Sequence, residues 1–205
     1  MKVSLKNQAL PITSIVLLLI LLIPSLHASG FANVWDKIKE LDELAKLTSV
    51  LVGTMIMSAI IPFNIRDKLL FLRINDELPS RRVKKLALKD ARMGELFIRR
   101  RYPELLDTDC PDKQHEIWWG AYQQSKNDKP VIVTHRAYLI FRDAFSSTLV
   151  MFFIALIERF IFVEVDIMPG NLSYYFVCTL ILKIISTNYA NRFTLNVLTS
   201  EKFTA

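Results

Sequence analysis

Apolar residues gather in four stretches of the chain, which segments rich in charged and polar residues separate. The stretches cover residues 9–26, 47–65, 144–163 and 172–190. A helix needs about 20 apolar residues to cross the hydrocarbon core of a bilayer, which is about 30 Å thick. The pattern therefore predicts an all-α integral membrane protein with four transmembrane helices.

The polar segments complete the predicted order of the chain. Phe31, Trp35 and Ile38 recur at helical spacing and predict an amphipathic helix on the outer face of the membrane. The N-terminal stretch also has the pattern of a cleavable secretory signal peptide, so both interpretations stay open. The predicted order is a signal-anchor-like first span in 1–30, the outer amphipathic helix in 31–46, the second span in 47–65, a basic helical domain in 66–143, the third span in 144–163, an outer turn in 164–171, the fourth span in 172–190 and a tail in 191–205.

The distribution of positive charge predicts the orientation. Residues 66–143 contain seventeen lysines and arginines, whereas residues 164–171 contain none. Loops rich in lysine and arginine stay on the cytoplasmic side of a membrane. We therefore expect a multi-pass protein of the inner (plasma) membrane, with the basic domain and both termini in the cytoplasm.

Residues 80–101 carry nine lysines and arginines against two acidic residues. The spacing predicts one helix from Arg81 to Arg101, capped by Ser80. Such a stripe of cations would attract anionic lipid headgroups, a nucleotide, a nucleic acid or an acidic protein partner. A solvated face that follows the charge bias of cytoplasmic loops is the alternative interpretation. The stripe on this predicted helix consists of Arg82, Lys85, Lys89, Arg92 and Arg99.

The next predicted helix contains Trp118, Trp119 and Tyr122. Aromatic side chains beside a basic surface can stack on nucleic-acid bases. Trp118 and Tyr122 also stand four residues apart, so both lie on one helix face. We favour a role in the core of the small domain over a role in base stacking.

Three charged residues interrupt the predicted third and fourth spans, namely Glu158, Arg159 and Lys183. Ionisable groups within a membrane are costly and normally face a bundle interior or an aqueous cavity. Glu158 and Lys183 lie at similar predicted depths, so one hypothesis is an ion pair that locks the two spans together. The second is that the three residues line a conduction or gating path, and the third is a contact with an outside ligand.

The sequence gives little support to catalysis. His27, His115 and His135 lack the spacing of a helical zinc site, and the chain has only five glycines and no phosphate-binding loop. The acidic residues from Asp107 to Glu116 lack the central glycine of a calcium loop. We therefore expect that the protein is not an enzyme and that it binds no metal ion or cofactor.

Four spans and a basic domain favour an oligomeric protein that changes membrane permeability under control of that domain. A pore would need several copies, because one copy offers few polar residues within the membrane. In architecture alone, the chain resembles the small membrane subunits of prokaryotic antiviral defence systems, which sense infection or permeabilise the membrane. The alternative is a non-conducting sensor or anchor that recruits a cytosolic protein or a nucleic acid.

Overall fold

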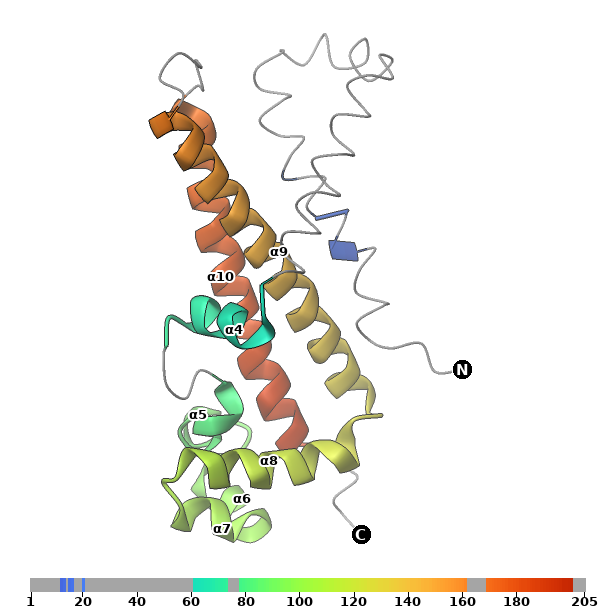
Figure 1. Cartoon of the computed structure of the whole chain (residues 1–205). Helices are drawn as coiled ribbons and strands as arrows, with labels where there is room; N and C mark the ends of the chain where they lie inside the picture. Colours follow the sequence, from blue (N-terminus) through green and yellow to red (C-terminus); the bar gives the residue numbers. More distant parts are fainter. Residues whose placement is uncertain are drawn as a thin grey trace. The chain divides into compact units, whose positions relative to one another are not determined.

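The computed structural model describes residues 12–13, 15–16, 20, 61–73, 78–161 and 169–200 (Figure 1). Its helices are α4 (Phe63–Phe71), the 3-10 helix η2 (Pro79–Arg82), α5 (Val83–Lys89), α6 (Gly94–Arg101), α7 (Pro103–Asp107), α8 (Pro111–Ser125), α9 (Lys129–Ile161) and α10 (Pro169–Leu198). These residues contain no strand, which confirms the all-α prediction for the described part of the chain. The predicted outer amphipathic helix and most of the first two predicted spans lie outside it.

Helices α9 and α10 are the two long elements. Among the described residues, α9 is the one helix that is both long and apolar enough to cross a membrane, over Lys129–Ile157. Helix α10 coincides with the predicted fourth span but does not reach that apolarity, since it includes Lys183 and Asn188 among its polar residues. Of the predicted spans, the third is therefore the one that the structure supports by length and composition.

The chain divides into two compact units, residues 1–66 with 140–184 and residues 67–139 with 185–205. In the first, the rings of Phe152 (α9) and Phe176 (α10) lie 5.7 Å apart. In the second, the rings of His135 (α9) and Phe193 (α10) stack 4.4 Å apart. Late residues of α9 thus contact early residues of α10, as expected for a helical hairpin.

The second unit has a hydrophobic core to which α5, α6, α7, α8, α9 and α10 contribute. Helices η2, α5, α6, α7 and α8 lie close together in Figure 1, and η2 and α5 both contact α8. The last two turns of α10 lie within the same core, so the domain is completed by residues 191–198, which the sequence predicted as part of the cytoplasmic tail. The main core residues are Val83 and Ala87 of α5, Ile98 of α6, Leu105 of α7, Trp118 and Ala121 of α8, Val131 of α9 and Phe193, Leu195, Val197 and Leu198 of α10.

The prediction of one helix from Arg81 to Arg101 is wrong. The segment forms η2, α5 and α6, with a turn between α5 and α6. Asp90 ends α5, and its side chain accepts a hydrogen bond of 2.9 Å from the backbone N–H of Arg92, a local bond that competes with helix continuation. Gly94 follows with φ of +59°, a left-handed conformation that favours glycine.

Candidate functional site

The break at Asp90–Met93 distributes the predicted cationic stripe over three elements and a turn. Arg82 lies in η2, Lys85 and Lys89 lie in α5, Arg92 lies in the turn and Arg99 lies in α6. A single helix face therefore does not carry all five cations. Each has to be considered with its own neighbours.

Arg82 is half-buried, and its guanidinium carbon lies 5.8 Å from the centre of the Phe71 ring. Such stacking is favourable between a cation and an aromatic face. Burial, with a contribution from the positive charge of Arg73, lowers the pKa of Arg82 below its ordinary value. An arginine nevertheless stays protonated in proteins, so this residue places a charge against an apolar surface.

Arg92 and Arg99 are both paired with carboxylates. The Nε and Nη2 atoms of Arg92 donate hydrogen bonds of 3.0 and 2.9 Å to the two carboxylate oxygens of Asp90. These bonds lower the pKa of Asp90 and raise that of Arg92. The Nη1 atom of Arg92 also donates a 3.1 Å bond to Asn196 of α10, while Arg99 pairs with Glu95 one helical turn away at 2.7 Å.

Only part of the predicted stripe keeps an exposed charge without an ion-pair partner, and one further arginine outside the stripe does so too. Lys85 and Lys89 of the stripe are exposed, and so is Arg100, which was not part of it. Within the described residues, no ion pair involves any of these three side chains. Lys84 does not offer a free charge to a ligand, because its ammonium donates hydrogen bonds to the Leu106 carbonyl at 2.6 Å and to Asp109 at 2.8 Å.

A groove of about 710 Å³, which no local sequence pattern predicted, lies between α7 and α8. Glu104, Asp107 and Glu116 contribute carboxylates to its lining, and Ile117 contributes apolar surface. A Cβ atom placed on Gly120, which also lines the groove, would have no neighbour within 4 Å. Arg101 and Lys113 also line the groove, so its lining carries three carboxylates and two cations, and at Gly120 it borders the backbone of α8.

Two aromatic residues of α8, Trp118 and Tyr122, pack in the hydrophobic core, which is the role that their spacing favoured. Trp118 is 5% exposed, and its indole Nε1 donates a 3.1 Å hydrogen bond to the carbonyl of Thr194 in α10. Its ring stacks on that of Tyr122 at 5.5 Å and meets Phe193 edge-on at 5.6 Å. Trp119 is instead 47% exposed.

His115 of α8 forms a hydrogen bond to η2. Its Nδ1 atom and the hydroxyl of buried Ser80 share a hydrogen bond of 2.8 Å. Ser80 therefore does not cap a helix, and η2 begins without a side-chain cap bond. Burial lowers the pKa of His115, and the positive charge of Arg81 lowers it further, while Asp112 opposes the shift. The imidazole is consequently held in its neutral form near pH 7.

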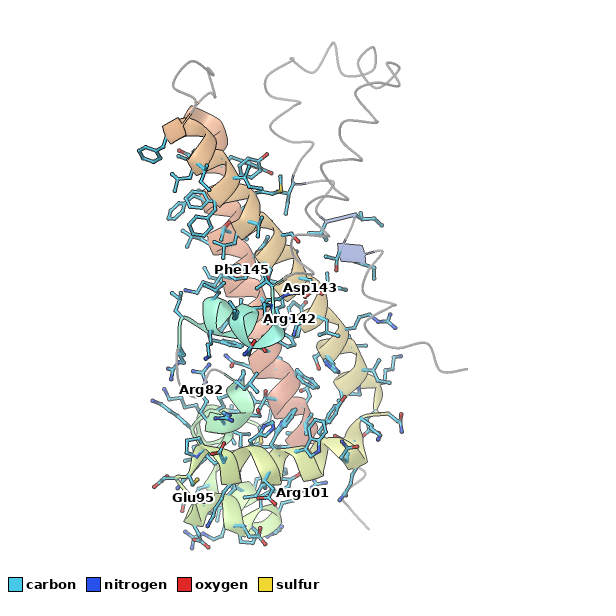
Figure 2. All side chains as sticks on the ribbon, in the orientation of Figure 1. Arg82, Glu95, Arg101, Arg142, Asp143 and Phe145 are labelled. Carbon is cyan, nitrogen blue, oxygen red and sulfur yellow. The ribbon has the colours of Figure 1, made fainter. Side chains whose placement is uncertain are left out.

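A buried charge cluster that the sequence analysis missed joins α4 to α9 in the first unit. Arg66 and Arg142 each contact the same Oδ1 atom of Asp143 at 3.1 Å, and both arginine side chains are less than a tenth exposed. The Nε atom of Arg66 also donates a 2.9 Å bond to the carbonyl of Ile61. Figure 2 shows Arg142 and Asp143 on α9. The sequence signal that could have revealed the cluster is the charge at the cytoplasmic ends of the predicted second and third spans, where Arg66 and Asp143 stand.

The predicted intramembrane residues are only partly described. Glu158 and Arg159 belong to α9, but their side chains lie outside the described residues, so the pair of Glu158 with Lys183 stays a prediction. Lys183 is half-buried on α10. Within the described part of the chain, no three histidine, cysteine or acidic side chains lie close enough together to hold a metal ion.

The arrangement as a whole offers charged and apolar binding surfaces. Exposed cations occupy α5 and α6, a groove lined by three carboxylates and two cations runs between α7 and α8, and the end of α10 lies within the same domain. No protein-family model, curated protein or solved structure matches this chain.

Proposed function

We propose that this protein is a multi-pass inner-membrane protein whose basic cytoplasmic domain controls the permeability of the membrane through α10. The observation that carries the proposal is the dual character of this one helix. Large apolar side chains of α10 are exposed in the first unit, and its last two turns are buried in the hydrophobic core of the second.

The exposed apolar side chains of α9 and α10 support insertion into lipid. Exposed apolar surface of this extent is unfavourable in water and typical of a membrane or protein interface. The hydroxyls of Thr148 and Thr179 donate to the carbonyls of Ala144 and Tyr175 four residues earlier, which satisfies them without water. The exposed residues are Phe153, Ile154, Ile157 and Phe160 on α9 and Phe176, Val177, Leu180, Ile181 and Ile184 on α10.

The attachment of α10 to the domain supports control by the domain. Beyond the apolar core, Trp118 donates to the Thr194 carbonyl, Arg92 donates to Asn196, and the Tyr102 hydroxyl donates to the Leu198 carbonyl at 3.1 Å. A ligand that favours one arrangement of the domain shifts the equilibrium by its difference in affinity for the two states. Because the contacts join α8, the α5–α6 turn and α10, such a shift would also move α10.

Permeability is the effect that the predicted intramembrane charges favour. Glu158, Arg159 and Lys183 would be costly against lipid and less costly against one another or water. Several copies arranged symmetrically would place the polar faces of the third and fourth spans around one axis. The proposal therefore includes a homo-oligomer.

A non-conducting anchor that recruits a cytosolic partner is the second candidate. Ser146 and Thr148 of α9 are buried and donate to the carbonyls of Arg142 and Ala144. This small polar face thus needs no water, as expected if it packs against protein. The exposed charges of Lys85, Lys89 and Arg100 would then serve an anionic partner.

One reconstitution experiment separates these candidates. The purified full chain in liposomes is tested for ion flux as wild type, as Glu158→Ala and as the control Glu164→Ala, which lies in the predicted outer turn. We expect flux in the wild type and the control, and a changed conductance or ion selectivity in Glu158→Ala. Absence of flux for all three proteins, with an anionic partner bound through Lys85 and Lys89, would favour the anchor.

A further inference from the structure

The basic domain presents two surfaces that nothing in the described structure covers. The first is a protruding apolar residue with cations beside it on α6. The second is the groove between α7 and α8, in whose lining carboxylates outnumber cations by three to two. Both belong to the same compact unit, so one chain carries both halves of a possible contact.

The protruding residue is Leu96, which is 83% exposed, more than any other large apolar side chain of the described residues. Arg99 and Arg100 follow three and four residues later and therefore stand on the same side of α6. Arg100 has no ion-pair partner within the described residues, whereas Arg99 contacts Glu95. We call Leu96, Arg99 and Arg100 the knob.

The groove between α7 and α8 has the opposite character. Glu104, Asp107 and Glu116 form none of the ion pairs found among the described residues, although the protein as a whole has a net charge of +6. Gly120 leaves space above the surface of α8, and Ile117 offers an apolar contact beside it. Leu96 does not line this groove in its own chain.

We propose that the knob of one copy inserts into the groove of a second copy, so that the basic domains join the protomers of the oligomer. Leu96 would occupy the space above Gly120, and the arginines beside it would meet Glu104 and Glu116. The inference rests on the proposed function only for its oligomeric assembly. It adds that the cytoplasmic domain itself makes a subunit contact.

A second copy fits the knob better than an anionic lipid surface does. Leu96 is the one large exposed apolar residue of α6, so insertion into a bilayer would bury little apolar area. The groove offers a leucine apolar contact at Ile117, and its three carboxylates outnumber the two cations, Arg101 and Lys113, that also line it.

Energy transfer between donor-labelled and acceptor-labelled full chains in detergent micelles tests the contact. We expect Leu96→Asp, and Gly120→Leu, which fills the groove, to weaken self-association by about 10- to 100-fold, the loss expected for one buried leucine. Leu72→Asp changes another exposed leucine of the domain that belongs to neither surface, and serves as the control. This variant should associate as the wild type does, with unchanged circular dichroism.

Mixing the two disrupted variants makes the test specific. Leu96→Asp keeps an intact groove and Gly120→Leu keeps an intact knob, so the mixture should associate more tightly than either variant alone. Unchanged association in both variants, or no gain on mixing, would overturn the inference. So would a loss that occurs only in phosphatidylglycerol vesicles and not in micelles, since it would assign the knob to lipid. Each of these results leaves the flux measurement on Glu158→Ala as a separate test of function.

Discussion

The same substitution at two glycines of the basic domain should change stability in opposite directions. Gly120 lies within α8 and Gly94 at the start of α6 with φ of +59°. At either position, an added Cβ would have no neighbour within 4 Å, so steric crowding is absent from both comparisons. The difference between Gly120→Ala and Gly94→Ala therefore isolates the preference of the backbone.

The expected magnitudes follow from that preference. Alanine in a helix interior is more stable than glycine by about 0.8–1.0 kcal/mol, so Gly120→Ala should stabilise the domain by about 1 kcal/mol. A side chain in the left-handed region costs about 1–2 kcal/mol, so Gly94→Ala should destabilise it by a similar amount. For a chain of this size, 1 kcal/mol corresponds to about 2–4 °C in Tm.

Thermal unfolding of the full chain in detergent, followed by circular dichroism at one fixed protein concentration, measures both shifts. Fixed concentration is needed because self-association also raises the apparent stability. A Tm change of the same sign in both variants would refute the reasoning. An unchanged Tm in Gly94→Ala would show that α6 can begin without a left-handed residue.

Three further predictions concern single side chains. Asp143→Asn removes the carboxylate that Arg66 and Arg142 share and should lower the free energy of unfolding by about 3 kcal/mol, while Asp143→Glu should lower it less; equal effects would contradict a role for the charge. Because the folded-state pKa of His115 is lowered, the unfolded state binds its proton first, so Tm should decrease as pH falls below about 6.5 and His115→Gln should flatten this dependence. Leu105→Ala, at a fully buried position, should cost about 2–5 kcal/mol in unfolding measurements, and a loss under 1 kcal/mol would contradict its place in the core.

Local patterns in the sequence were sufficient for the helical class of the described residues and for the region of one long apolar helix, α9. The periodicity and length of the third apolar stretch predicted the region where α9 is long and apolar enough to span a membrane. The pairing of Trp118 with Tyr122 on one face also followed from a spacing of four residues. These features depend on neighbours along one helix, which the sequence gives directly.

The segment from Arg81 to Arg101 shows where local patterns misled. Its lysines and arginines favour a helix, and their spacing suggested a continuous stripe. The side-chain bonds of Asp90 and the left-handed Gly94 ended the helix instead. A glycine four residues after the helix-ending aspartate was visible in the sequence, but strong helix formers stand on both sides of it.

Only the tertiary structure decided which surfaces of the domain stay free. Arg92 and Asn196 stand 104 residues apart, and Arg66 and Asp143 stand 77 apart, so no periodicity relates them. The end of α10 enters the core, and α7 contacts α8, because the chain reverses direction between these elements. The sequence determined helices and the sign of their charge, whereas packing decided that Arg92 is neutralised, that Lys85 is not, and that three carboxylates gather around one groove of a basic domain.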